Sequence, residues 1–80
     1  MDRAALLEMF KTKASEVAEK QFPQLSESSV IASLGIDSLA MLEVIGEMER
    51  ELGITIPDDQ LVGIEKVGQL LDVVQKRMKK

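Results

Sequence analysis

The chain has 80 residues, of which 45% are hydrophobic and 30% are charged, and its net charge is −4. It contains no cysteine and no histidine, which excludes disulfides, thiolate metal sites and histidine-based catalysis. A chain of this length forms one small domain, and we expect residues 1–80 to fold as a single unit. Its aromatic residues are Phe10 and Phe22, so the core has to be built mainly from aliphatic side chains.

The charge is distributed unevenly along the chain. Residues 37–65 contain eight acidic side chains and a single basic one, Arg50. An acidic region without aromatic stacking residues argues against nucleic acid and favours a partner with a basic surface. No apolar run approaches the roughly 20 residues that span a membrane, and the N-terminus lacks the features of a secretion signal. We therefore expect an intact, cytoplasmic, monomeric protein that does not bind membranes.

The first helix is predicted over about residues 3–20, with Asp2 as its N-cap. Apolar residues at helical spacing form its buried stripe: Leu6, Met9, Phe10, Ala14 and Val17. Phe22-Pro23 is expected to end it, because the residue before a proline disfavours helical geometry. A long loop over residues 24–35 follows, with a short helical turn near residues 28–32. Four apolar residues are expected to hold this loop against the bundle: Leu25, Val30, Ile31 and Leu34.

A second helix is predicted over residues 38–52, because Asp37 is a natural N-cap and Gly53 a natural terminator. Its core-facing residues follow each other at steps of three or four: Leu39, Leu42, Ile45, Met48 and Leu52. A different face carries Ala40, Glu43, Glu47 and Glu51. Gly46 lies inside this helix, where glycine costs about 0.5–1 kcal/mol relative to alanine. It indicates either close helix packing or room for a bound molecule beside the core.

Two further helices complete the predicted fold. Ile54 and Ile56 are expected to point inward from an extended segment, and a short third helix runs from about residue 57 to residue 62. The last helix is predicted over about residues 65–78, with a buried stripe of Val67, Leu70, Leu71, Val74 and Met78. The fold class is therefore all-α, a four-helix bundle with three long helices, one short third helix and a long loop after the first helix.

Ser38 is the candidate functional residue. At the first position of the second helix its hydroxyl is expected to be exposed at the positive end of the helix dipole, which favours an attached phosphate. Asp37 beside it would be placed to assist a metal-dependent transferase. Taken alone, Asp37-Ser38-Leu39 more often marks an ordinary helix start. We do not expect the chain itself to be an enzyme or to bind a metal.

The wider sequence resembles the acyl carrier protein family. The similarity lies in Leu34-Gly35-Ile36-Asp37-Ser38-Leu39-Ala40-Met41-Leu42-Glu43 and in residues 49–59, and it continues through Ile64, Val67 and Leu70-Leu71. It covers nearly the whole chain and is strongest from residue 34 to residue 74. The length is similar to that of the free-standing carriers of dissociated synthases.

The resemblance implies a covalent cofactor. A separate phosphopantetheinyl transferase would move phosphopantetheine from coenzyme A onto Ser38, with Asp37 and Leu39 beside the attachment point. Acyl groups would then be held as thioesters on the thiol of that arm. The implied partners are the transferase, a ketosynthase, an acyltransferase and other synthase enzymes.

The resemblance also makes the second helix a docking surface. Glu43, Glu47 and Glu51 would attract basic patches of the partner enzymes, and Leu39 and Met41 would supply apolar contacts. The alternatives are that the acids form a solvated face and that Leu39 belongs to the core. Six apolar residues either line a cleft for the acyl chain or belong to the ordinary core: Met41, Met48, Leu61, Val62, Leu70 and Leu71.

Two positions at which the sequence departs from carriers of fatty acid synthesis bear on the pathway. Ala40 and Ser33 stand where carriers of fatty acid synthesis often have acidic residues, and residues 37–43 are more similar to carriers of dissociated type II polyketide synthases. We therefore expect a role in polyketide or other specialised biosynthesis, with fatty acid synthesis as the alternative. An alternative of another class is an unmodified helical domain that binds a basic partner through its acidic second helix.

Overall fold

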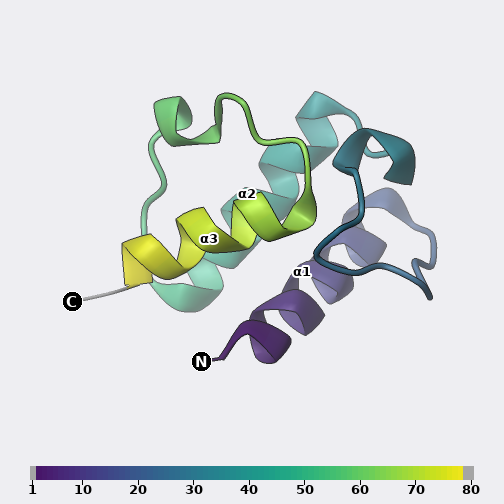
Figure 1. Cartoon of the computed structure of the whole chain (residues 1–80), viewed down its shortest axis with the longest axis horizontal. Coiled ribbons are helices and arrows are strands. Elements are labelled where there is room, and N and C mark those ends of the chain that lie inside the picture. The colour runs from purple at the N-terminus through teal and green to yellow at the C-terminus, as the bar shows by residue number, and fades with distance from the viewer. Residues whose placement is uncertain (1, 79–80) are drawn as a thin grey trace.

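Three α-helices and two short 3-10 helices make up the fold. The computed structural model describes residues 2–78. It contains α1 (Arg3–Ala18), η1 (Ile31–Leu34), α2 (Ser38–Leu52), η2 (Asp58–Leu61) and α3 (Val67–Met78) (Figure 1). No β-strand occurs in residues 2–78, where one isolated bridge joins Val30 and Lys66. The all-helical prediction is confirmed, while the expected short third helix is present as the four-residue 3-10 helix η2.

The boundaries of α1 follow from local capping. Asp2 accepts a hydrogen bond from the amide of Ala5 at 2.8 Å, as predicted for the N-cap. The helix ends at Ala18, two residues earlier than predicted, because Glu19 adopts a left-handed conformation with φ of 57°. The Glu19 amide still donates to the carbonyl of Ser15, which closes the last turn. The chain therefore leaves the helix before it reaches Phe22-Pro23.

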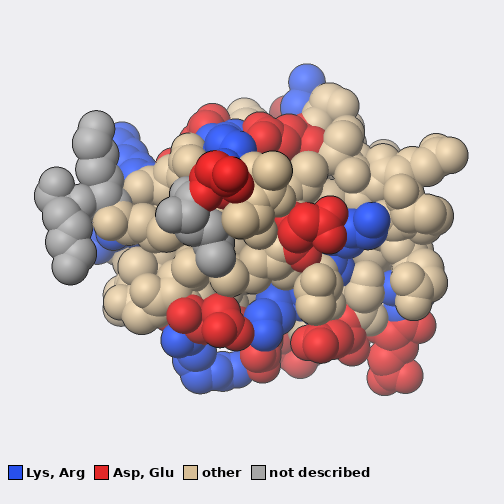
Figure 2. All heavy atoms as spheres, turned by 90° about the horizontal axis from the view of Figure 1, so that it is seen from below, with Lys and Arg blue, Asp and Glu red and all other residues tan. Residues whose placement is uncertain are grey.

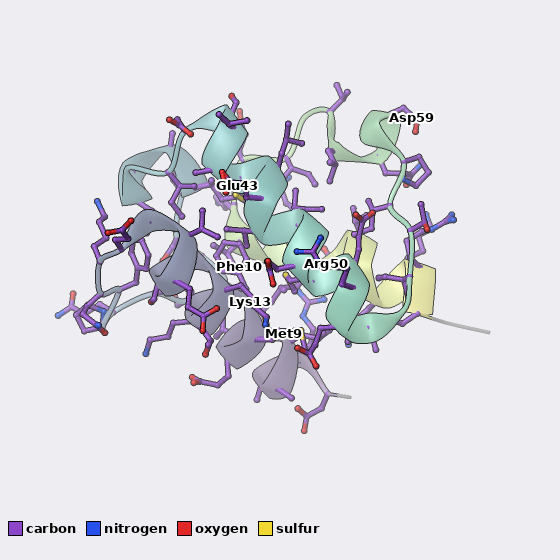
Figure 3. All side chains as sticks on the ribbon, turned by 180° about the vertical axis from the view of Figure 1, so that it is seen from behind. Met9, Phe10, Lys13, Glu43, Arg50 and Asp59 are labelled. Atoms are coloured by element: carbon purple, nitrogen blue, oxygen red, sulfur yellow. The ribbon has the colours of Figure 1, made fainter. Side chains whose placement is uncertain are left out.

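The core is aliphatic and lies where the three α-helices meet. Phe10 is fully buried on the side of α1 that faces α2, as Figure 3 shows from behind. The predicted stripes of α1 and α3 are confirmed. Seven of their side chains have no exposed surface: Leu6, Phe10, Ala14, Val67, Leu70, Leu71 and Val74. Met9, Val17 and Met78 pack against this core as partly buried residues. From the connecting segments, the most deeply buried side chains are Phe22, Ile31, Ile36 and Ile56.

The predicted core face of α2 is partly wrong. Leu39 and Leu42 point outward, with 69% and 53% of their surface exposed. Val44, which the prediction left out, is fully buried beside Ile45 and Met48. The helix has apolar residues on two sides, and the side that carries Val44, Ile45 and Met48 is the buried one. Because this side is buried, Leu39 and Leu42 remain on the surface near Ser38.

The start of α3 depends on the long loop between α1 and α2. Carbonyls of Ser29 and Glu27 accept hydrogen bonds from the amides of Val67 and Gly68, at 3.0 and 2.8 Å. The side-chain oxygen of Gln69 accepts hydrogen bonds from the backbone amides of Glu65 and Lys66, just before the helix, each at 2.8 Å. These bonds satisfy the backbone amides at the start of α3, for which the helix itself has no carbonyl partner. They place the helix start at Val67, two residues later than predicted.

Arg3 ties α1 to the long loop and to α3. Its guanidinium donates to both carboxylate oxygens of Glu27, to Asp72, to Gln75 and to the carbonyl of Gly68. The hydrogen bonds that Arg3 donates to Glu27, and next those to Asp72, raise the pKa of Arg3 above its usual value. The group therefore stays charged at every pH at which the protein is studied, and its contribution to stability does not depend on its own titration.

We expect Arg3→Lys to lower the free energy of unfolding by about 1–2 kcal/mol, because an ammonium cannot reproduce the forked contacts of a guanidinium. Urea denaturation followed by circular dichroism measures this loss. Arg77→Lys is the matched control, because Arg77 is exposed and, within residues 2–78, donates a single side-chain hydrogen bond, to the carbonyl of Thr55. An equal, small effect of both substitutions would show that the Arg3 contacts contribute little.

The surface carries charges of both signs. Figure 2, which views the molecule from below, shows acidic and basic side chains close to each other rather than one continuous patch of a single sign. Within residues 2–78, no helix combines the length and the apolar character that crossing a membrane would require.

Candidate functional site

The turn before α2 places Ser38 at the surface. Gly35 ends η1 with a φ of 75°, a conformation that side-chain-bearing residues rarely adopt. A Cβ at this position would also lie 2.7 Å from the Nζ of Lys20. Ile36 follows, and only 7% of its surface is exposed. Its burial anchors the chain to the core. Asp37 and Ser38 then come out into solvent, and both are exposed.

Asp37 caps α2 as predicted. Its carboxylate accepts a hydrogen bond from the amide of Ala40 at 2.8 Å, and its carbonyl accepts from the amide of Met41 at 2.9 Å. Among residues 2–78 no acceptor is found for the amides of Ser38 and Leu39, which remain available to solvent or to a ligand. The helix start therefore presents an exposed hydroxyl, two free amide donors and the positive end of the helix dipole.

A mostly apolar groove of about 660 Å³ opens beside Ser38. Its walls come from the long loop with η1, from α2, from the segment 61–66 and from α3: Val30, Ile31, Ala32, Ile36, Asp37, Ser38, Met41, Leu42, Ile45, Leu61, Ile64, Glu65, Lys66 and Leu70. Of the six residues proposed for a cleft, Met41, Leu61 and Leu70 line the groove. Met48 and Leu71 are fully buried outside the groove lining, and Val62 is 81% exposed on the surface.

The acidic row of α2 lies on the surface, and part of it forms ion pairs within the chain. Glu47 accepts from Arg50 at 2.6 Å, and Glu51 pairs with Lys13 of α1 at 3.3 Å. Glu43 is exposed and has no ion-pair partner among residues 2–78 (Figure 3). The pair between Arg50 and Glu47 is exposed and contributes little to stability, so a basic side chain of a partner can replace Arg50 at low cost.

Comparison with known proteins identifies the family. The family model described as the phosphopantetheine attachment site matches residues 5–74. The chain belongs to this family. An acyl carrier protein of Porphyromonas gingivalis (strain ATCC 33277) is 34% identical over 74 residues, which cover 92% of this chain and 86% of the relative. The anthracycline acyl carrier protein DauA of Streptomyces sp. (strain C5) is 28% identical over 81 residues, covering 99% and 96% of the two chains.

A solved structure supports the same assignment. The crystal structure of an acyl carrier protein from Thermotoga maritima matches with a TM-score of 0.88 and 31% sequence identity, covering 98% of this chain and 92% of that chain. As a member of the carrier family the chain is a non-catalytic protein with a covalently bound phosphopantetheine cofactor. The helix start fits such a group, because the free amides and the helix dipole favour a phosphate and the apolar groove adjoins it.

The sequence-based prediction missed Leu42, Ile64, Glu65 and Lys66 as groove residues. Leu42 was assigned to the core, although it follows Ser38 by four residues and therefore shares a face with it. This spacing was a usable signal. The positions of Glu65 and Lys66 at the groove had no comparable local signal, because they depend on the pairing of the loop with the start of α3.

Proposed function

We propose that Ser38 carries the phosphopantetheine arm and that the chain, as one carrier domain over residues 1–80, moves acyl groups between synthase enzymes. The observation that supports Ser38 is its exposed position at the first residue of α2, in a chain that belongs to the phosphopantetheine attachment family. Asp37 fixes the helix start through its cap, and Leu39 provides an exposed apolar surface next to the hydroxyl.

Each part of the site has a distinct task in this proposal. The bound arm supplies a thiol that forms thioesters with acyl groups. The amides of Ser38 and Leu39 would hold the phosphate, and the groove would receive the apolar part of an acyl chain and exclude water from it. Met41, Leu61 and Leu70 would form its apolar lining. The groove wall also includes the charged residues Glu65 and Lys66, so polar groups on the cargo are tolerated there.

The partners in this proposal are a phosphopantetheinyl transferase, a ketosynthase, an acyltransferase and other synthase enzymes. Docking would use Leu39, Met41, Glu43, Glu47 and Glu51 on α2. Leu39 and the acids reach the surface, and Met41 is partly buried at the groove, which allows contact with a partner that carries basic side chains. The partly apolar, partly charged surface suits short-lived contacts, as a protein that visits several enzymes requires.

For the pathway we propose polyketide or another specialised biosynthesis. Ala40 and Ser33 support it, and anthracycline carriers are among the similar proteins. Fatty acid synthesis is the second candidate, because the similar proteins also include carriers whose names specify no specialised product, such as the acyl carrier protein of P. gingivalis. Family membership speaks against the third possibility, an unmodified interaction domain.

Intact-mass spectrometry tests the carrier function directly. The protein is incubated with coenzyme A, Mg²⁺ and a phosphopantetheinyl transferase of broad carrier specificity, next to a carrier that is known to be modified. We expect a mass increase of one phosphopantetheine group per chain. An unmodified chain beside a fully modified control carrier would refute the proposal.

We expect Glu43→Lys combined with Glu47→Lys to raise the KM of the transferase for this protein about tenfold, because the variant replaces attraction of a basic surface by repulsion. The effect should shrink as the salt concentration increases. Glu8→Lys with Glu16→Lys is the matched control, because both residues are exposed on α1 and the net charge changes equally. The same KM for both double variants would mean that net charge, rather than α2, governs docking.

A further inference from the structure

Two walls of the groove are joined to each other by backbone hydrogen bonds. The amide of Ile31, in the wall from the long loop, donates to the carbonyl of Glu65, in the wall before α3, at 2.8 Å. The first amides of α3 donate to carbonyls of the same loop. We call the paired residues 27–31 and 65–68 the loop–α3 seam, and Figure 1 shows the loop beside the start of α3. These two walls therefore separate only if the seam opens.

Gly68 is the tightest point of the seam. Its amide donates to the carbonyl of Glu27 at 2.8 Å. A Cβ on Gly68 would lie 3.1 Å from this carbonyl oxygen and 3.2 Å from both the Cβ and the Oε1 of Glu27. Carbon atoms in good contact lie about 3.5–4.0 Å apart, so any side chain at residue 68 pushes the loop away. Glycine allows the two backbones to approach this closely.

Gly46 in α2 has the opposite surroundings. A Cβ at this position would meet no other segment of residues 2–78 within 4 Å, which contradicts the prediction of close helix packing. Gly46 also does not line the groove, so it does not provide room for cargo there. A side chain added at Gly46 therefore leaves both the seam and the groove untouched.

Arg3 connects the two sides of the seam at its tight end. Its guanidinium pairs with the carboxylate of Glu27 and donates to the carbonyl of Gly68 at 3.0 Å. A further bond to Asp72, at 2.6 Å, extends the contact to the next turn of α3. Loop and helix are thus held together by one side chain in addition to the backbone bonds.

The groove has a closed inner end. It follows α2 from Ser38 to Ile45, which corresponds to about 10 Å along the helix axis. Apart from Ile36 beside Ser38, its buried lining residues are Ile31, Ile45 and Leu70, and they form this inner end. With carbon–carbon bonds of about 1.5 Å, an extended chain of about eight carbons has the length of the groove. A longer chain either leaves its remaining carbons in water or requires an open seam.

We propose that the loop–α3 seam limits the acyl chains that the groove takes up to about eight carbons, and that Gly68 and Arg3 determine this specificity by keeping the seam closed. This inference rests on the proposed carrier function and names the class of cargo, which is short acyl groups. Both are positioning residues, because they act through the groove wall and do not line the groove themselves. Methylenes beyond the limit stay hydrated and add no stability.

Thermal unfolding of acylated protein measures the limit. The broad-specificity transferase is supplied with butyryl-, octanoyl-, dodecanoyl- or hexadecanoyl-coenzyme A, and intact-mass spectrometry verifies each product. The Tm of each acyl form is compared with that of the same variant carrying the unacylated arm. Each buried methylene should raise the Tm by up to about 3 °C. For the wild type we expect the Tm to rise from the butyryl to the octanoyl form and then to stay constant within about 2 °C.

Gly68→Val is the variant that opens the seam. Because valine does not fit against Glu27, we expect the Tm of its dodecanoyl form to exceed that of its octanoyl form by at least about 5 °C. Hydrogen exchange at the Ile31 amide should accelerate at least about tenfold, since its bond across the seam loosens. Gly46→Val is the matched control and should give wild-type values in both measurements. If Gly68→Val does not fold, Arg3→Gln, which removes the ionic contacts of the seam, takes its place.

A merely structural role of the seam predicts a different result. A variant that is only less stable has a lower Tm in every form, and the differences between its acyl forms remain those of the wild type. Phe10→Leu provides this reference, because Phe10 is buried in the core and does not line the groove. We expect its chain-length limit to equal that of the wild type.

The outcomes distinguish the two proposals. If the wild-type chain is not modified at all, the proposed function fails. If it is modified and its Tm keeps rising up to the hexadecanoyl form, or does not depend on the acyl chain, the carrier function stands and the chain-length limit is refuted. A wild-type limit in Gly68→Val, or an equal shift of the limit in Gly46→Val or Phe10→Leu, would refute the role of the seam.

Discussion

Ser38→Ala is expected to abolish the mass increase that phosphopantetheine attachment produces. The variant lacks the Oγ to which the phosphate would be joined, and no neighbouring group can replace it at the helix start. Alanine is a strong helix former at an exposed helix position, so the circular dichroism spectrum and the Tm should remain close to those of the wild type. Intact-mass spectrometry after incubation with coenzyme A and the transferase measures the effect.

Two other exposed serines provide the control for this experiment. Ser28 lies in the long loop and Ser33 in η1, and neither is the first residue of an α-helix. Ser28→Ala and Ser33→Ala should be modified at the wild-type rate. Full modification of Ser38→Ala would show that the arm is attached to another residue, and it would refute the site proposed at the start of α2.

Phe10→Ala is expected to destabilise the protein by about 3–5 kcal/mol, because it removes a large, fully buried side chain between α1 and α2. A domain of this size has a total stability of about 4–12 kcal/mol, so much of the population can unfold at 37 °C. Thermal and urea denaturation measure the loss. The rate of phosphopantetheine attachment should fall with the folded fraction, since the exposed helix start exists only in the folded chain.

Phe10→Leu is the control for the cavity explanation. Leucine keeps most of the buried apolar volume and should cost less than half as much as alanine. Equal losses for both substitutions would indicate that the shape of the aromatic ring, and not the volume of the cavity, determines the stability at this position.

Much of the helical fold was predictable because the relevant signals are local. The bounds of α2 agree with the prediction at both ends, since Asp37 caps the first turn with its own carboxylate and Gly53 takes the left-handed conformation that ends the helix. The buried stripes of α1 and α3 were also predictable, because each of these helices has one clearly apolar face. The exposed position of Ser38 followed from the same local motif, whereas its assignment as the attachment residue rested on the resemblance of the wider sequence to acyl carrier proteins.

The errors in α2 have a different origin. Leu39 and Leu42 were as apolar as Val44, so the helix could have packed with either side against α1. Which side is buried depends on how the neighbouring helices fit against α2, and no residue within the helix determines that. The same holds for Gly46, whose open surroundings become visible only when the other segments are in place.

By itself, the sequence determined three features of this protein: where its long helices lie, which apolar residues α1 and α3 bury, and that an isolated serine follows a capping aspartate. Caps, left-handed glycines and apolar periodicity act within a few residues, so they can be read along the chain. Only the tertiary structure decided the outward turn of Leu39 and Leu42, the start of α3 at Val67 and the groove beside Ser38. Those features arise from contacts between segments that are distant in sequence, such as the hydrogen bonds of residues 27–31 to residues 65–68.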